Sequence, residues 1–273
     1  MAQPFILAQL SDPHIDLTPE ADAHLEQAVQ HLLGLPFPVH AVIISGDLTD
    51  SGAEAEYTRC EELLSSLEAP IFTVPGNHDH RERFLEAFGI QGDPSLTDFV
   101  QYVVEDFPLR LVALDTHLPN KSGGNLCETR LHWLEQRLAE APNKPTLIFM
   151  HHPPFTLGNT ILDGIGLENA EAFGDIVEQH RQIERIVAGH THTLTMQRFG
   201  GTLSLTCPAV QTQMLLDVTQ PDRLEAIMQP PSCLLHIWRQ ETGILTQPSL
   251  IGKHGPLQTF HDGERWTSDY TGK

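Results

Sequence analysis

The sequence predicts an α/β fold with a mixed β-sheet, and three observations favour this class. Short apolar, β-favouring runs alternate with longer amphipathic stretches along the first 190 residues or so. Strand–helix–strand order of this kind implies right-handed crossovers and a largely parallel core with helices outside. The chain of 273 residues can bury a substantial core, and 40% hydrophobic with 19% charged residues is a globular composition.

Each predicted element rests on its own pattern. A helix is predicted over 19–33, because Thr18 is a good N-cap and Pro19 suits a first helical position. Similar amphipathic patterns predict helices over 53–67, 127–140 and 167–181. Buried strands are expected at six apolar runs, namely residues 5–10, 41–45, 71–74, 110–114, 146–150 and 185–189.

The remaining strands are expected to be antiparallel. FVQYVVED (99–106) precedes another apolar run and predicts an antiparallel pair, which makes the sheet mixed. Gly200-Gly201 predicts the turn of a hairpin, 232–250 suggests two more strands, and 209–233 carries no clear periodicity. We therefore divide the chain into a core over 1–199 and a segment of C-terminal strands and cap over 200–273.

Charge and cysteine content limit the possible partners. The net charge of 16 − 36 = −20 disfavours binding to a nucleic-acid polymer or an anionic membrane. A phosphate-bearing substrate would therefore need a local positive centre, which a bound cation could supply. The four cysteines form no C-x-x-C pair, so neither a disulfide framework nor a thiolate zinc site is predicted: Cys60, Cys127, Cys207 and Cys233. Without a basic leader or a membrane-spanning run, we expect a cytoplasmic protein with no membrane partner.

Ligand-type residues follow five of the predicted strands. They are Asp12 and His14; Asp47; Asn77 and His78; His151 and His152; and His190 and His192. Loops at the carboxyl ends of parallel strands converge on one crevice, so these groups are expected to meet. Taken singly, an Asp-x-His or a Gly-Asp is ordinary turn chemistry. All five together predict a metal site.

The number of candidates predicts two ions. Asp12, His14, Asp47, Asn77, His151, His190 and His192 are too many ligands for one ion with an open position. Nitrogen and oxygen donors without sulfur suit Mn, Fe, Co or Zn. A pair of such ions is an arrangement that binds a phosphoryl group and activates water. No Ser or Cys has a recognisable base, so attack by metal-bound hydroxide is preferred over a covalent intermediate.

The set Asp12-x-His14, Gly46-Asp47, Gly76-Asn77-His78-Asp79, His151 and Gly189-His190-x-His192 resembles the calcineurin-like metallophosphoesterases. The resemblance implies an αββα sandwich with mixed sheets. It places Asp12, His14 and His192 on one metal and Asn77, His151 and His190 on the other. Asp47 would bridge both ions. It also implies that His78 is a catalytic acid or charge stabiliser facing the phosphate, and that Asp79 orients its imidazole.

Among branches of that family, the sequence is more similar to class III cyclic-nucleotide phosphodiesterases and glycerophosphodiesterases. FMHHPPFTLGN and GHTHTLTM particularly resemble the second branch. The implied activity is hydrolysis of small phosphodiesters, either glycerophosphodiesters or 3′,5′-cyclic nucleotides. Residues 209–233 match no motif, and in this family that region forms substrate wall and oligomer contacts. We therefore expect a homo-oligomer.

Two other functions remain open. A phosphomonoesterase of the same fold would need extra fixed positive groups, and only Arg81 and Arg83 lie near a motif. Both are expected at the surface, as arginine usually is. A non-catalytic metal-binding or scaffold protein would have a degraded ligand set or lack His78. The charge and the absence of a basic, aromatic-interleaved face disfavour a deoxyribonuclease.

Overall fold

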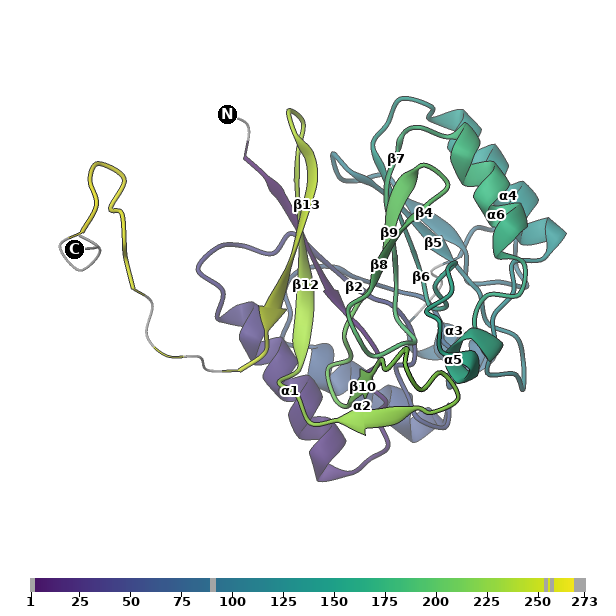
Figure 1. Ribbon diagram of the computed structural model, residues 1–273, viewed down its shortest axis with the longest axis horizontal. Coiled ribbons are helices and arrows are strands. Elements are labelled where there is room, and N and C mark those ends of the chain that lie inside the picture. Colours follow the sequence, from purple (N-terminus) through teal and green to yellow (C-terminus); the bar gives the residue numbers. More distant parts are fainter. Residues whose placement is uncertain (1–2, 89–91, 253–254, 256–257, 268–273) are drawn as a thin grey trace.

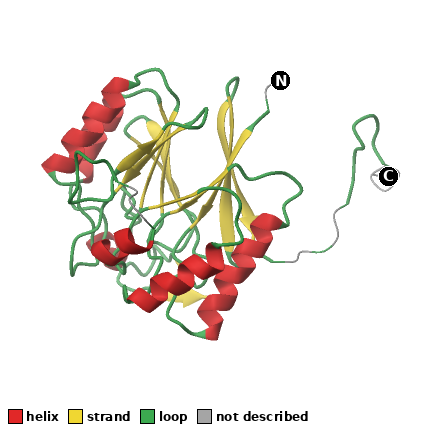
Figure 2. Cartoon of the chain, turned by 180° about the vertical axis from the view of Figure 1, so that it is seen from behind, coloured by secondary structure: helices red, strands yellow, loops and turns green. Residues whose placement is uncertain are grey.

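The computed structural model describes residues 3–88, 92–252, 255 and 258–267. Two β-sheets face each other, and helices cover the outer side of each (Figure 1, Figure 2). The predicted α/β sandwich with mixed sheets is confirmed. Every helix in the described ranges falls short of the length and apolarity that crossing a lipid bilayer requires.

The first sheet contains strands from the N-terminal and the C-terminal parts of the chain. Its strand order is β13-β12-β1-β2-β3, with β1 (Phe5–Leu10), β2 (Ala41–Ile44) and β3 (Ile71–Thr73) parallel. The antiparallel strands β12 (Ser232–Arg239) and β13 (Gly243–Leu250) extend it beyond β1. Helices α1 (Pro19–Leu33) and α2 (Glu54–Leu64) lie on its outer side, and α3 (Arg81–Ala87) packs beside α2.

The second sheet has the order β4-β5-β6-β7-β9-β8. Four strands are parallel: β5 (Arg110–Leu114), β6 (Thr146–Met150), β7 (Ile183–Ala188) and β9 (Thr202–Thr206). The antiparallel β4 (Tyr102–Val104) and β8 (Met196–Phe199) close its edges. Helices α4 (Glu128–Glu140) and α6 (Ala170–Gln179) cover its outer face, and α5 (Thr160–Gly164) lies in the loop between β6 and α6.

Successive side chains in the strands of the second sheet face opposite sides, and this explains why each strand is a continuous apolar run. Leu147 and Phe149 of β6 point into the core between the sheets, whereas Ile148 and Met150 pack against α4 and α6. Both faces of each strand are therefore buried. A parallel sheet covered by helices on one side and a second sheet on the other requires this pattern.

The main departures from the predicted elements lie at their ends. Helix α2 stops at Leu64 rather than 67, where Ser65 closes the last turn through its bond to the Glu62 carbonyl. Helix α6 begins at Ala170 rather than 167, because the Asn169 amide is committed to the backbone of Leu126. Within 209–233, where no element was predicted, β10 (Gln213–Leu215) and β11 (Glu225–Ile227) form a two-stranded ribbon.

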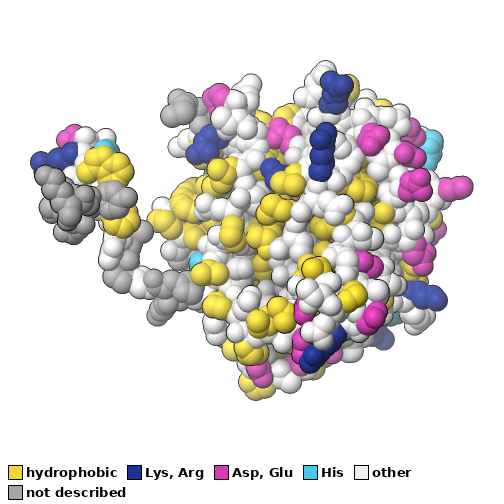
Figure 3. Space-filling model, viewed as in Figure 1, with side chains coloured by type: hydrophobic (Ala, Val, Ile, Leu, Met, Phe, Trp, Pro, Cys, Tyr) yellow, Lys and Arg dark blue, Asp and Glu magenta, His cyan; other side chains and the backbone are white. Residues whose placement is uncertain are grey.

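The acidic excess is visible on the surface. On the face seen in Figure 3, acidic side chains gather on the right, over α4 and α6. Residues 258–267, which include a bridge between His261 and Trp266, lie apart from both sheets (Figure 1).

Candidate metal centre

The ligand-type residues lie where strands of both sheets end. Asp12 and His14 follow β1, Asp47 follows β2, and Asn77 follows β3. From the second sheet, His151 follows β6, whereas His190 and His192 follow β7. Because these strands are parallel within each sheet, their carboxyl ends share one edge of the sandwich. The convergence expected from the sequence is what the structure shows.

Short distances connect residues of the two sheets. His151 Nε2 lies 3.3 Å from Asp47 Oδ2 and 3.1 Å from Asn77 Oδ1. His192 Nε2 lies 3.5 Å from Asp12 Oδ1 and 3.1 Å from His14 Nε2. Side chains more than 70 residues apart in sequence therefore form one cluster of nitrogen and oxygen donors.

Asp47 occupies the centre of the cluster. Its Oδ2 lies 3.6 Å from His14 Nε2 on one side and 3.3 Å from His151 Nε2 on the other. Two donor groups with ligand atoms within 4.8 Å of one another are Asp12, His14, His192 and Asp12, Asp47, His151. A third group is formed by His151, His152 and His190, and a fourth, more exposed group by His14, Asp50 and His78.

The donor set fits metal ions. His190 Nε2 is buried, and no hydrogen bond to a described residue satisfies it. A buried polar atom without a partner is rare in proteins and requires a reason, and a ligand role supplies one. All the donors are carboxylate, amide or imidazole atoms, the types preferred by first-row transition metals.

Electrostatics keep the carboxylates ionised. Burial by itself would raise the pKa of Asp47, but the nearby His151 and His14 hold it well below the usual value. Burial opposes protonation of His151, yet Asp47 and Asp12 raise the pKa of this imidazole to about 9. Burial, together with the charge on His151, lowers the pKa of His190 to about 3. The cluster thus offers ionised carboxylates, the form that binds cations.

The backbone of the cluster is unusual. Asp12, His14, Asp47, His190 and His192 all have positive φ, between 42° and 69°. Such left-handed conformations are uncommon outside glycine. They turn the chain sharply off each strand and aim the side chain back into the crevice.

Three glycines make room for the cluster. A Cβ atom on Gly46 would collide with the His151 ring, and one on Gly76 would collide with the Asp47 carboxylate. A Cβ on Gly189 would collide with Ser11 Oγ. The absence of a side chain at each position permits the close approach of loops from different strands.

His78 lies beside the cluster, with 41% of its side chain exposed. Its Nδ1 lies 2.7 Å from the carbonyl oxygen of Asp50, and its backbone N–H donates to Asp47 Oδ1 at 2.9 Å. Its ring packs edge-on against His14, with the centroids 4.6 Å apart.

The expected contact between Asp79 and the His78 imidazole is not seen, and this expectation is corrected. The buried Asp79 carboxylate instead accepts hydrogen bonds from Gly76 N at 2.9 Å, Leu48 N at 3.2 Å and Tyr57 Oη at 3.1 Å. It therefore joins the loop after β2 to the loop after β3. Burial, with the nearby Asp47 charge, raises the pKa of Asp79 to about 6.

His152 supports the cluster from behind. Its Nδ1 lies 2.8 Å from Thr116 Oγ1 and its Nε2 lies 3.1 Å from the Ser122 carbonyl. Both ring nitrogens thus have protein partners. Its ring centroid lies 4.5 Å from that of His190, so His152 packs against this residue.

Sequence reasoning missed a sixth strand end. After β5 come Asp115, Thr116 and His117, and Asp115 forms a two-point ion pair with Arg81 through Nε–Oδ2 at 2.6 Å and a second guanidinium nitrogen at 3.0 Å. Arg81 is therefore not a surface residue, because only 16% of its side chain is exposed. The signal was present as Asp-Thr-His directly after an apolar run. Asp50, whose carbonyl oxygen is bonded to His78, was missed because it lies three residues after Asp47.

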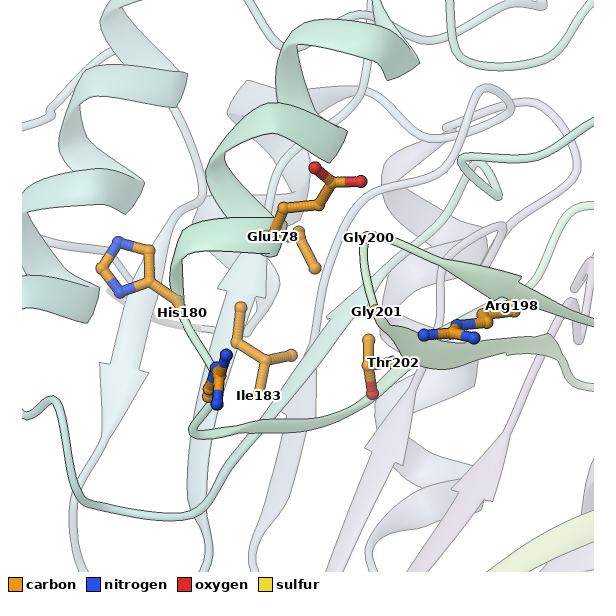
Figure 4. A pocket seen from close by; sticks show the side chains of 9 residues that line it. Glu178, His180, Ile183, Arg198, Gly200, Gly201 and Thr202 are labelled. Carbon is orange, nitrogen blue, oxygen red and sulfur yellow. The ribbon is translucent and has the colours of Figure 1, made fainter.

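Two cavities differ in position. One of about 510 Å³ borders the cluster and is lined by residues that include Asn77, His78, Arg81 and His117. A larger one of about 720 Å³ lies at the amino ends of β7 and β9, at the opposite edge of the sheet. There the end of α6 and the β8–β9 turn surround the space, with Arg198 and Thr202 on the hairpin side (Figure 4).

Comparison with known proteins gives concordant results. A family model described as calcineurin-like phosphoesterase matches residues 6–194. The chain is 33% identical over 266 residues to a probable glycerophosphodiester phosphodiesterase GpdQ of Arcobacter nitrofigilis, covering 94% of this chain and 97% of that protein. It is 34% identical to a probable cyclic nucleotide phosphodiesterase of Rhodopseudomonas palustris, covering 81% of each.

A solved structure shows a similar fold. The crystal structure of a dimetal phosphatase from Danio rerio superposes with a TM-score of 0.68 at 17% identity, covering 92% of this chain and 100% of the other. At this identity the likeness concerns the fold alone.

Proposed function

The chain belongs to the calcineurin-like phosphoesterase family, and from this premise we propose that it is a metal-dependent hydrolase of small phosphodiesters. Glycerophosphodiesters and 3′,5′-cyclic nucleotides are the two substrate classes, because relatives named for each match most of the chain. The observation that carries the proposal is the convergence of Asp12, Asp47, Asn77 and the imidazoles of both sheets on one edge.

We assign the ligands to two ions. Asp12, His14 and His192 would hold one ion, and Asn77, His151 and His190 the other. Asp47 would bridge them, which its position between His14 Nε2 and His151 Nε2 supports. The donor types suit Mn, Fe, Co or Zn. When bound, such ions supply Lewis acidity, offsetting charge on the phosphoryl oxygens and acidifying water toward a pKa of about 7.

His78 would assist the departure of the leaving group. A carbonyl oxygen only accepts hydrogen bonds, so Nδ1 of His78 must be the donor to Asp50. This bond fixes the ring and leaves Nε2 to face the substrate. A proton carried on Nε2 can pass to the departing alkoxide, or its charge can stabilise the phosphorane-like transition state.

The neighbouring arginines favour a diester over a monoester. A dianionic monoester would gain from fixed positive charge, but Asp115 neutralises Arg81. Arg83, which also lies in the first turn of α3, donates a hydrogen bond to the Gly52 carbonyl. Phosphomonoesterase activity is therefore the second candidate. A scaffold role would not require the complete set of buried donors.

A substrate panel tests the proposal. Metal-loaded protein is incubated with cyclic nucleotides, glycerophosphodiesters and phosphomonoesters, and kcat/KM is compared. We expect a diester to have the highest value, exhaustive chelation to abolish activity, and Mn or Co to restore it at least as well as Zn. Full activity without detectable metal by elemental analysis would contradict the dinuclear assignment. Higher kcat/KM for monoesters would favour the second candidate.

We also propose that the protein forms a homo-oligomer in the cytoplasm. The segment 208–231 exposes apolar side chains outside the two sheets, with Val218 60% and Met228 91% exposed. Exposed apolar residues grouped on one segment often mark an interface. Sedimentation as a monomer at micromolar concentration would contradict this part of the proposal.

A further inference from the structure

The cavity beside His78 contains a buried imidazole that the proposed mechanism does not use. His117 lines this space of about 510 Å³ together with Asn77 and His78. Only 5% of His117 is exposed. The cavity thus begins at the group assigned to the leaving alkoxide and continues to His117.

His117 has unused hydrogen-bonding capacity. Its Nδ1 is buried, and no described residue forms a hydrogen bond with it. No hydrogen bond within the described ranges occupies Nε2 either. Nε2, unlike Nδ1, is not a fully buried atom, so it is the ring nitrogen that a ligand in the cavity can reach and pair with.

The backbone of His117 is firmly positioned. Its N–H donates to Asp115 Oδ1 at 2.9 Å, and its carbonyl accepts from Arg81 at 2.9 Å. Arg130, which is buried, donates to the Asp115 carbonyl at 2.7 Å. A buried ion-pair network thus fixes the backbone from which the His117 ring enters the cavity wall, as a recognition group requires.

The chemistry of the cavity specifies the kind of group it would accept. Burial lowers the pKa of His117 to about 4, despite the nearby Asp115, so the ring is neutral at pH 7. A ring nitrogen of a neutral imidazole either donates or accepts, depending on the tautomer, and a hydroxyl group can pair with it in either case. Glu82 and Asp98 also line the cavity, and neither forms an ion pair with a described residue, whereas Arg81, which lines it too, is paired with Asp115. Their charge disfavours a second anionic group in this space.

We propose that His117 is a specificity-determining residue that hydrogen-bonds a hydroxyl of the leaving alcohol, adjacent to the scissile ester. The inference rests on the proposed phosphodiesterase function. Both a glycerol arm and a ribose with its 2′-hydroxyl carry such a group. His117 forms no bond to the phosphate and acts only through recognition of the alcohol.

Matched substrate pairs test the proposal. The first pair is methyl glyceryl phosphate and methyl propyl phosphate, and the second is 3′,5′-cyclic AMP and its 2′-deoxy analogue. For wild type, kcat/KM should favour the hydroxyl-bearing member of at least one pair by about tenfold, the effect of one hydrogen bond of about 1.4 kcal/mol. The pair that discriminates identifies the source of the hydroxyl.

Two substitutions and one control complete the test. His117→Phe keeps a ring without nitrogens, so its hydroxyl preference should fall to within about twofold, whereas His117→Gln should retain part of the preference. His132→Phe, at an exposed histidine of α4, should leave the preference unchanged. Should His117→Phe fail to fold, His117→Gln is compared with His117→Leu under the same criterion.

The outcomes separate the two proposals. If wild type hydrolyses the diesters without a hydroxyl preference, or if His117→Phe keeps the full preference, the role of His117 is overturned and the phosphodiesterase function stands. If wild type hydrolyses monoesters but none of the four diesters, both proposals are overturned.

Discussion

The two ends of the sandwich hold cavities built on different principles. At the carboxyl ends of the strands, a cavity of about 510 Å³ borders buried acids and imidazoles held by neighbouring loops. At the amino ends, a larger cavity of about 720 Å³ is flanked by Arg181 and Arg198. Within the described residues neither guanidinium forms an ion pair, and both are exposed.

The difference teaches that convergence of buried polar groups, rather than volume, distinguishes the candidate site. Burying charged groups is costly unless they are paired or bind a metal, so such a cluster is a candidate functional site. Exposed arginines around an open hollow carry no comparable cost.

Asp47→Ala should be the most damaging change at the carboxyl end. Its carboxylate is assigned to both ions, so the variant should lose metal stoichiometry, and kcat should fall by more than about ten-thousandfold because the parts act as a unit. Asn77→Ala removes one neutral ligand and should mainly weaken one site. Elemental analysis and steady-state kinetics measure both. Two tightly bound ions in Asp47→Ala would disprove the bridge.

The loss of activity in His78→Ala should depend on the leaving group. A general acid contributes about 10²–10⁴-fold, and an alkyl diester needs that proton. The nitrophenolate of a nitrophenyl diester leaves readily without a proton, so the loss of kcat/KM on that substrate should be about tenfold or less. Metal content should match wild type. Equal losses on both esters would indicate charge stabilisation instead, and loss of an ion would show that His78 is a ligand.

Asp79→Asn should affect stability more than chemistry. The amide can replace only one of the two acceptor oxygens that bond Gly76 N, Leu48 N and Tyr57 Oη. We expect a loss of about 2–3 kcal/mol in the free energy of unfolding, because bonds to a charged group contribute about 1.5–3 kcal/mol each. Tyr57→Phe, which removes one bond, should cost about 1 kcal/mol. A variant of full stability that loses the leaving-group dependence of His78 would restore Asp79 as its orienter.

His236 of β12 is buried in the first sheet but is not a candidate metal ligand, so it shows the effect of burial alone. Both its nitrogens have partners, Thr246 Oγ1 at 2.9 Å and Gln9 Oε1 at 3.1 Å. Burial, with the charge of Arg185, lowers its pKa to about 3, below the unfolded value of about 6.5. Its stabilising contribution is therefore complete above pH 6.5 and declines as the pH falls toward 3.

At pH 5 this residue should reduce the free energy of unfolding by about 2 kcal/mol relative to pH 7. His236→Gln should remove that part of the acid sensitivity, as measured by denaturant unfolding of metal-loaded protein at both pH values. An identical pH dependence in wild type and variant would show that His236 is not held neutral.

The amino-end cavity should give the smallest effect. Arg181→Gln and Arg198→Gln should each change the free energy of unfolding by less than about 0.5 kcal/mol, as exposed substitutions do. The kcat/KM on the best diester should stay within about twofold of wild type. A tenfold loss in either variant would mean that the amino end takes part in the reaction, and the contrast between the two ends would fail.

Much of the fold and the cluster could be predicted from sequence because both follow from local patterns. Apolar runs identified the strands, and parallel order brought their carboxyl ends together without any side-chain information. Asp12, Asp47, Asn77 and the histidines after β6 and β7 were identified because each lies directly after a strand.

The supporting contacts could not be predicted, because they depend on side-chain direction. Adjacency to His78 suggested that Asp79 orients it, but neighbours in a turn point apart, and Asp79 points inward to the loop after β2. The Asp50 carbonyl took its place. Arg81 was expected in water because arginine usually is, yet its partner Asp115 lies 34 residues away in sequence. Only the folded chain brings them together.

The left-handed backbone at five ligand-type residues has an evolutionary consequence. Each costs about 1 kcal/mol or more relative to an ordinary conformation, and together they approach the whole net stability of a typical domain. Glycine at any of the five positions would relieve that cost and remove a ligand. In a library of variants sorted only for heat resistance, we expect Asp12, His14, Asp47, His190 and His192 to be replaced first, and thermal tolerance and turnover to diverge most at these positions.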